Sequence, residues 1–239
     1  MNDRRVMEVA SARLRRLSPT IFERIRMLRL RVDEASYSQE GEDRVLARYF
    51  ESVNAGFYVD VGAHDRMRFS NTLLFCRRGS RGVNIDAMPG SLRLFNKYRP
   101  DDVNIESGVG TECGELPFYV FNEPALNSFD ESLSRSRVSE RYKIVKVVKV
   151  PVSTLASLIN THVPRAEGPS FLTVDVEGRD LDALRSNNWA TFRPAVVLVE
   201  CLDSTLEEVM LNDVTVFPKL VGYGVVAKAV NTTFYKALN

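Results

Sequence analysis

The sequence is short of cysteine and of long apolar runs, and each shortage excludes a class of protein. Cys76, Cys113 and Cys201 are odd in number and lie far apart in a chain of 239 residues. They predict neither a disulfide framework nor a metal-binding spacing, so a reducing cytoplasm is the expected compartment. No apolar run is long enough to span a bilayer, and the arginine-rich N-terminus lacks the apolar core of a secretory signal.

An excess of charge of one sign is also missing. The 32 lysines and arginines nearly balance the 31 aspartates and glutamates, which leaves a formal net charge of +1. No overall basic field therefore favours nucleic acid as a partner. The hydrophobic share of 44% and the charged share of 26% are ordinary for a globular protein. A chain of this length can bury a full core, so we expect one α/β domain with an extension.

The glycine-rich turn of a dinucleotide site is missing as well, although the strand that would precede it is present. Residues 57–65 begin as a short apolar run, which predicts a buried strand that ends at Asp60 and Gly62. A pyrophosphate site needs G-x-G-x-x-G, and Gly62 has no further glycine in register. This excludes a nicotinamide oxidoreductase. Acids in the loop suit a cationic ligand such as S-adenosylmethionine, and a buried strand with a turn glycine is the alternative.

Acidic residues recur at the ends of the predicted strands. The apolar runs at 83–86 and 195–200 each end in an acid, and the run at 171–178 carries Asp175 and Glu177 before a glycine. Strands alternate with helices, and residues 223–236 predict a closing hairpin. This order predicts a doubly wound α/β sheet with an antiparallel strand near its edge. Ligands bind beyond the carboxyl ends of the central strands in such sheets, so we expect these residues to converge there: Asp60, Asp86, Gly108, Asp175 and Glu177.

The remaining elements are expected from capping and periodicity. Helices are predicted at 72–78, 89–100 and 180–187, and another carries Leu155 and is capped by Ser153. Ser38, with Glu42 and Asp43, predicts the polar start of a further helix that runs to Phe50. Strands are predicted at 103–106, 116–121 and 142–150. The polar stretch 122–141 is expected to be a loop that serves as a lid or contacts substrate.

Residues 1–35 form the expected N-terminal arm. Ser18 and Pro19 predict a helix start that divides the arm into two helices. Apolar residues recur there at three- and four-residue steps and give one stripe, while arginines occupy the other face. The stripe is expected to pack on the domain or on a second subunit. The alternative is peripheral contact with anionic lipid at the inner face of the membrane, or with polysaccharide.

From residue 37 onward the sequence resembles the FkbM-type S-adenosylmethionine-dependent methyltransferases. The motifs that carry the resemblance stand in the order of that family: Tyr37-Ser38-Gln39 with Gly41-Glu42-Asp43, Val59-Asp60-Val61-Gly62-Ala63-His64, Phe69-Ser70-Asn71-Thr72, Arg81-Gly82-Val83-Asn84-Ile85-Asp86-Ala87 and Asp175-Val176-Glu177-Gly178. The resemblance implies the class I methyltransferase fold, a Rossmann-like seven-stranded sheet, over residues 36–239. Characterised members are mostly O-methyltransferases, many of which act on sugar hydroxyls of glycans or glycosylated natural products.

The resemblance also implies a binding site for S-adenosylmethionine. It implies Asp60 and Gly62 under the methionine part, Asp86 on the ribose, and the turn at Gly108 and Val109 near the adenine. The expected cofactor-binding residues are Gln39, Asp60, Gly62, Ala63, Ser70, Asn71, Asp86, Ala87, Gly108, Val109 and Asp175.

Methyl transfer to a hydroxyl also needs help with proton removal, and three residues are candidates. His64 lies in the loop beside the predicted cofactor, and Asp175 and Glu177 form a carboxylate pair in which repulsion can raise a pKa. Asp175 is equally suited to hold the methionyl end. The pair could instead bind a divalent cation, but no metal-ligand spacing favours this, so we expect no metal.

The sequence also bears on two other classes of function. A base-flipping DNA methyltransferase needs an aromatic and proline platform where this chain has Asp175-Val176-Glu177-Gly178. A cofactor-binding scaffold without turnover stays open, as does an acceptor that is a non-sugar small molecule or a lipid.

The arm can be tested by deleting residues 1–35. The deletion should change the oligomeric state or the association with anionic vesicles, because it removes an apolar stripe and an arginine face. The affinity for S-adenosylmethionine should stay nearly unchanged. Gel filtration, vesicle sedimentation and calorimetry measure these quantities, and loss of cofactor binding would show that the arm is misplaced.

Overall fold

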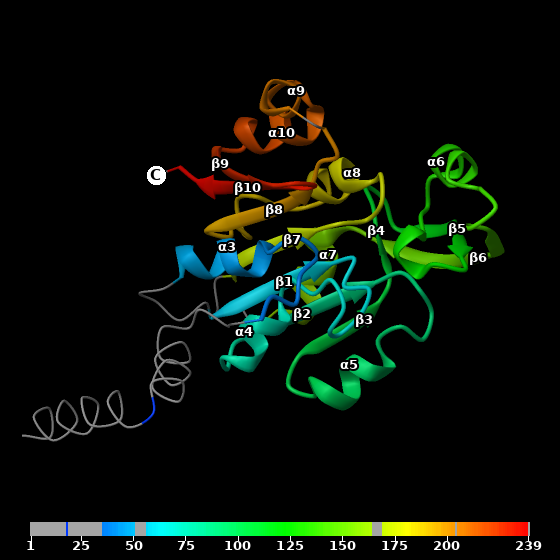
Figure 1. Cartoon of the computed structure of the whole chain (residues 1–239), viewed down its shortest axis with the longest axis horizontal. Helices are drawn as coiled ribbons and strands as arrows, with labels where there is room; N and C mark the ends of the chain where they lie inside the picture. Colours follow the sequence, from blue (N-terminus) through cyan, green and yellow to red (C-terminus); the bar gives the residue numbers. More distant parts are fainter. Residues whose placement is uncertain (1–17, 19–34, 51–55, 164–168, 204, 239) are drawn as a thin grey trace, which may run out of the picture. The chain divides into compact units, whose positions relative to one another are not determined.

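A computed structural model of the chain describes residues 18, 35–50, 56–163, 169–203 and 205–238 (Figure 1). The chain divides into Met1–Ser36 and Tyr37–Asn239, and the fold described here is that of the second unit. Nearly all of the predicted N-terminal arm lies outside the described residues. Among the residues that are described, no helix is long and apolar enough to cross a membrane.

A seven-stranded sheet forms the centre of the fold, as the resemblance implied. Its strands follow the order β3-β2-β1-β7-β8-β10-β9. Their bounds are β1 Phe57–Val61, β2 Arg81–Asp86, β3 Val103–Glu106, β7 Pro169–Val174, β8 Val196–Glu200, β9 Tyr223–Ala229 and β10 Thr232–Ala237. The first five strands in that order are parallel, and β10 is antiparallel to both of its neighbours. The predicted closing hairpin and the antiparallel strand near the edge are therefore confirmed.

Helices cover both faces of this sheet, because apolar residues on its central strands point both ways. Val59 and Val61 of β1 join the core that includes Leu155 and Leu184, whereas Tyr58 packs with Leu46 and Phe75 on the opposite face. The helices are α3 Glu42–Tyr49, α4 Leu73–Arg77, α5 Arg93–Tyr98, α7 Leu155–His162, α8 Asp180–Arg185, α9 Leu206–Leu211 and α10 Asp213–Leu220. Nothing in the sequence analysis predicted α9 or α10.

A second sheet stands beside the carboxyl ends of the main strands (Figure 1). It has the order β4-β6-β5, with β4 Gly108–Val109, β5 Gly114–Phe121 and β6 Ile144–Ser153. The prediction of a loop at 122–141 is wrong in part, because this stretch contains the short helices η1 Pro124–Leu126 and α6 Glu131–Ser136. Asp130 caps α6 by accepting a hydrogen bond from the Leu133 N–H. We call β4, β5, β6, η1 and α6 together the accessory sheet.

Two predicted helix starts are also wrong. The helix expected from residue 89 begins at Arg93, because Asp86 accepts hydrogen bonds from the Met88 N–H and the Ser91 hydroxyl and holds a turn there instead. The cap of α7 is Thr154, whose Oγ1 accepts from the Ser157 N–H at 3.1 Å, whereas Ser153 is the last residue of β6.

Candidate active site

A cavity of about 870 Å³ lies at the carboxyl ends of the central strands, between the main sheet and the accessory sheet. Neighbouring strands β2, β1, β7 and β8 each deliver a residue to it. Most of the residues predicted from the sequence line this cavity: Gln39, Gly62, His64, Asp86, Ala87, Gly108, Val109, Asp175 and Glu177. The expected convergence at the strand ends is therefore found for all but Asp60.

Asp60 is buried and does not line the cavity. Its Oδ2 accepts a hydrogen bond from the Thr72 hydroxyl at 2.9 Å, and the Arg99 guanidinium donates to the same hydroxyl and to Ser70 Oγ. Burial raises the pKa of Asp60 to about 6, against the opposing effects of the Thr72 hydrogen bond and the Arg99 charge. Asp60 and Ser70 thus hold the loop that follows β1 in position.

Two further predicted residues also lie outside the cavity wall. Ala63 is buried against Leu92 and Phe95. Asn71 donates to Thr173 Oγ1 at 3.1 Å and lines a small neighbouring cavity together with Asp175. Asn71 is therefore beside the site, and Ala63 supports the helix α5 side of it.

Gly62 is required by the chain itself. It has φ +89°, and a Cβ there would lie 1.7 Å from the backbone carbonyl oxygen of Asp175. The Gly62 and Ala63 N–H groups donate to the Ile85 carbonyl, which draws the loop across β2. No side chain fits where β1 and β7 leave the sheet so close together.

Asp86 lies at the end of β2 with most of its acceptor capacity in use. Its Oδ2 accepts from the His64 N–H at 2.8 Å, and its Oδ1 accepts from the Met88 N–H and the Ser91 hydroxyl. Burial raises the pKa of Asp86, and these hydrogen bonds oppose that shift. A carboxylate has about four acceptor positions, so one remains for a ligand hydroxyl.

Three carboxylates gather at the ends of β7 and β8. Oxygens of Asp175, Glu177 and Glu200 all lie within 4.8 Å of one another. Asp175 is open to the cavity but otherwise surrounded by protein, and this burial, with the charges of Glu200 and Glu177, raises its pKa well above the usual range. Burial and the charges of Glu177 and Asp180 raise the pKa of Glu200 to about 8. The group therefore retains a proton at neutral pH.

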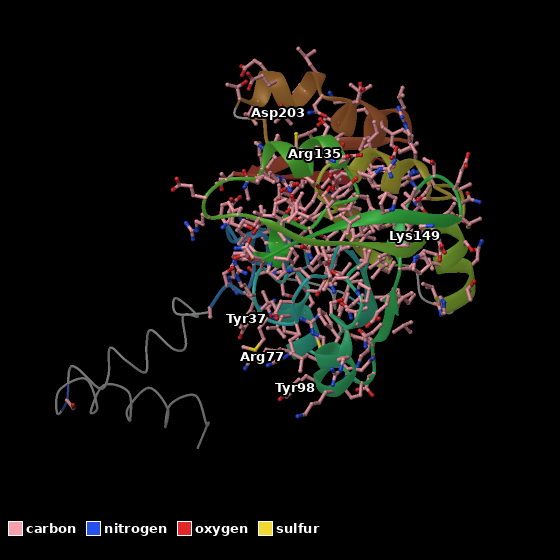
Figure 2. The ribbon with its side chains drawn as sticks, turned by 90° about the vertical axis from the view of Figure 1, so that its right-hand side faces the viewer. Tyr37, Arg77, Tyr98, Arg135, Lys149 and Asp203 are labelled. Carbon is pink, nitrogen blue, oxygen red and sulfur yellow. The ribbon has the colours of Figure 1, made fainter. Side chains whose placement is uncertain are left out.

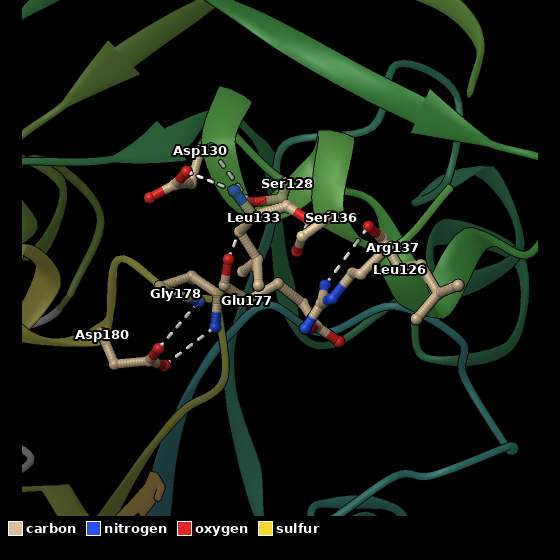
Figure 3. A network of polar contacts seen from close by, with 10 residues as sticks. Leu126, Ser128, Asp130, Leu133, Ser136, Arg137, Glu177, Gly178 and Asp180 are labelled. Carbon is tan, nitrogen blue, oxygen red and sulfur yellow. Dashed lines mark hydrogen bonds and ion pairs between the residues drawn. The ribbon is translucent and has the colours of Figure 1, made fainter. Parts of the chain in front are cut away.

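Arg137, which follows α6 in the accessory sheet, forms an ion pair with this cluster. The sequence analysis did not predict it as a site residue. Its guanidinium lies 2.6 Å from Glu177 Oε2, and the two side chains are 18% and 20% exposed. Burial raises the pKa of Glu177, and the positive charge and hydrogen bond of Arg137 oppose that shift. Figure 3 shows this pair together with the bond from the Ser128 hydroxyl to the Glu177 carbonyl at 2.7 Å.

Glu200 stands in the sequence as an acid at the end of a predicted strand, a signal that could have placed it in the site. Arg137 gave no such signal, because it follows a short helix inside a stretch that was expected to be a loop. Both line the same cavity as Glu177.

His64 is half-buried in the cavity wall beside Phe69, with 6.3 Å between the ring centroids. Burial lowers the pKa of its imidazole. The ring is therefore neutral at physiological pH and can accept a proton. Its φ of 50° is in the left-handed region, and its N–H is held by Asp86.

A sequence profile described as Methyltransferase FkbM domain matches residues 60–221. The chain belongs to the FkbM methyltransferase family. None of the curated proteins matches it. The matched span of this FkbM methyltransferase runs from the end of β1 to the end of α10 and includes the accessory sheet. It supplies every lining residue of the cavity except Gln39.

A divalent cation fits the site only in part. Among the residues that the structure describes, Asp175, Glu177 and Glu200 are the group that could hold one. Their oxygens suit Mg²⁺, which takes six ligands and keeps several waters. The guanidinium of Arg137, however, already occupies Glu177 Oε2. We therefore favour proton removal by a side chain over activation of the hydroxyl by a metal ion.

The acidic cluster predicts that the unliganded protein loses stability as the pH rises. The pKa of Glu200 is about 8 in the folded protein, above the ordinary 4.5, so the folded state retains a proton that the unfolded state releases between those values. The free energy of unfolding should fall across this window. Each pKa unit corresponds to roughly 1.4 kcal/mol, and neighbouring carboxylates share the effect.

Urea unfolding at pH 5 and pH 8 measures this fall. Glu200→Gln removes the titration, so the variant should lose at least about 1 kcal/mol less than wild type between the two pH values. The exposed Glu106→Gln at the end of β3 is the matched control and should behave as wild type. Equal pH dependence of wild type and Glu200→Gln would contradict the assignment.

Proposed function

We propose that this methyltransferase transfers the methyl group of S-adenosylmethionine to a hydroxyl, most readily one on a sugar of a glycan, polysaccharide or glycosylated metabolite. One observation carries the proposal. A single cavity holds, along adjacent strands, a carboxylate that can accept hydrogen bonds from the cofactor's ribose and carboxylates that can act as bases. Asp86 ends β2, and Asp175 and Glu177 follow β7, with β1 between them. A volume of about 870 Å³ is sufficient for a cofactor and an acceptor together.

The charge of the site supports a cationic cofactor. Burial and mutual repulsion raise the pKa values of Asp175, Glu177 and Glu200. A nearby cation favours the ionised form of such groups, and S-adenosylmethionine carries a sulfonium and an ammonium. The β2 side offers instead Asp86 and the backbone of Gly108 and Val109, which suit the neutral ribose and adenine.

When bound, S-adenosylmethionine supplies an electrophilic methyl group. Transfer of that group to an acceptor hydroxyl would release the hydroxyl proton, which a side chain of the protein would have to take. Glu177 can take it when Arg137 keeps the carboxylate ionised. His64 can take it as a neutral imidazole. Asp175 lies where it can hold the methionyl ammonium or assist the same transfer.

Lining residues from the loop after β1 and from the accessory-sheet side support a sugar acceptor. The aromatic rings of Phe69 and Tyr142 are part of the lining. The ion pair of Arg68 and Glu123, at 2.8 Å, and the side chain of Asn127 add polar groups. Sugars present C–H faces and many hydroxyls, which such a mixed surface can contact. A methyl-transfer screen of glycans and nucleotide sugars, read by mass shift, tests this proposal. If only lipids or non-sugar metabolites are methylated, the acceptor belongs to one of those classes and not to the sugars.

The ribose assignment predicts the effect of Asp86→Ala. Loss of this carboxylate should weaken S-adenosylmethionine binding by roughly 1.5–3 kcal/mol, the range for hydrogen bonds to a charged group. Isothermal titration calorimetry measures the affinity. Glu106→Gln, at the end of the neighbouring strand β3 and outside the cavity, is the control and should bind as wild type. Unchanged affinity in a folded Asp86→Ala protein would remove Asp86 from the site.

The base assignment predicts selective losses of turnover. Glu177→Gln and His64→Ala should each lower the rate by up to about 10²–10⁴, the range for general-base catalysis, with a much smaller change in cofactor affinity. Asp175→Asn should damage both quantities if Asp175 also holds the cofactor. Near wild-type rates in all three variants would show that positioning alone carries the reaction.

Two further outcomes separate the alternatives. If EDTA abolishes turnover and Mg²⁺ restores it, the carboxylates of Asp175, Glu177 and Glu200 hold a cation. If wild type binds S-adenosylmethionine but methylates nothing in the screen, the protein is a cofactor-binding scaffold.

A further inference from the structure

A second cavity, of about 420 Å³, lies beside α4 and α5 and shares no lining residue with the methyltransferase cavity. Four arginines line it from different segments of the chain: Arg66, Arg77, Arg81 and Arg99. Asp101 and Asp102 are its acidic lining residues. Figure 2 shows two of the lining residues, Arg77 and Tyr98, close to one another along one edge of the domain, next to Tyr37.

Most of this positive charge has no carboxylate partner within the part of the chain that the structure describes. Of the four, only Arg81 forms an ion pair with another described residue, Asp101 at 3.1 Å. The Arg66 guanidinium lies 4.0 Å from the centre of the Tyr98 ring, and Arg77 donates to the Tyr37 hydroxyl. These aromatic contacts orient the two guanidiniums without neutralising them.

Arg99 forms the buried part of the wall. It is 4% exposed, and its terminal nitrogens donate to the Thr72 and Ser70 hydroxyls and to the Arg66 carbonyl. Its Nε has no hydrogen-bond partner among the described residues. Asp60 offsets this charge through the Thr72 hydroxyl, but no carboxylate of the described residues touches the guanidinium directly. A buried donor without an acceptor is costly unless an anion in the cavity supplies one.

The acids in the wall do not supply that anion. Asp102 Oδ2 accepts from the Tyr58 hydroxyl and from Asn84 Nδ2, and its Oδ1 accepts from the Gly82 N–H. Asp102 is therefore engaged with the strands β1 and β2 beneath the cavity. Asp101 is exposed and already pairs with Arg81.

We propose that this second cavity binds the phosphoryl group of a small phosphorylated molecule. Planar guanidinium forks match phosphate oxygens, and a phosphoryl group can accept from several arginines that approach from different directions, whereas one fork saturates a carboxylate. The exposed side chains of Tyr98 and Met67 in the same wall provide apolar surface for the organic part of the ligand. This site is separate from the methyltransferase reaction and does not depend on it.

Calorimetric titration of the full chain with inorganic pyrophosphate, at fixed ionic strength in chloride, tests the proposal. Wild type should bind one pyrophosphate. Arg66→Gln and Arg77→Gln should each weaken binding by at least about tenfold, the equivalent of one charged hydrogen bond. Arg135→Gln, an exposed arginine on α6 paired with Glu131, is the matched control and should bind as wild type. S-adenosylmethionine affinity should be the same in all four proteins.

Two results overturn the proposal. One is the absence of saturable pyrophosphate binding to wild type. The other is an equal loss in Arg135→Gln, which would indicate unspecific attraction to arginine. Should the glutamine variants fail to fold, phenylglyoxal labelling of wild type decides instead. Pyrophosphate should slow the modification of Arg66 and Arg77 but not of Arg135, and lack of protection would refute the site.

Discussion

Repulsion among carboxylates at the ends of β7 and β8 is the constraint on which the arrangement of the site depends. Oxygens of Asp175, Glu177 and Glu200 lie within 4.8 Å of one another, and ionised carboxylates that close repel strongly when protein surrounds them. The protein meets this repulsion with a retained proton and with the guanidinium of Arg137. Since Arg137 follows α6, the charge that relieves the cluster also holds the accessory sheet against it.

Contacts with the accessory sheet also explain the backbone conformation of the loop after β7. Glu177 has φ 54°, a left-handed conformation that costs a side-chain-bearing residue about 1–2 kcal/mol. The Ser128 hydroxyl binds its carbonyl, and Asp180 accepts from the Val176 and Gly178 N–H groups on either side. Leu133 of α6 occupies the space that a Cβ on Gly178 would need. The loop therefore takes its shape from the accessory sheet and α8 together.

The strands of the main sheet could be predicted because each is an apolar run followed by a turn signal, and the acids at their ends came with them. The place of Asp60 was predictable in principle and was missed. It alternates with Val59 and Val61 along β1, and period two puts it on the face toward α4 instead of at the sheet edge. Arg137 could not be found this way, because a long-range ion pair leaves no periodic trace in the sequence.

The hydrogen bonds around Asp60 give it a structural role, since it does not line the cavity. Thr72 donates its proton to Asp60 and accepts one from Arg99, so a single hydroxyl joins a buried carboxylate to a buried guanidinium. Removing either charge would leave the other buried and uncompensated, which costs more than the pair contributes. The loop from Gly62 to Thr72 is tied down at this point, and His64, at its other end, is held by Asp86. Asp60 within β1 and Asp86 at the end of β2 thus fix the loop that carries one candidate base, and of the two only Asp86 also lines the cavity.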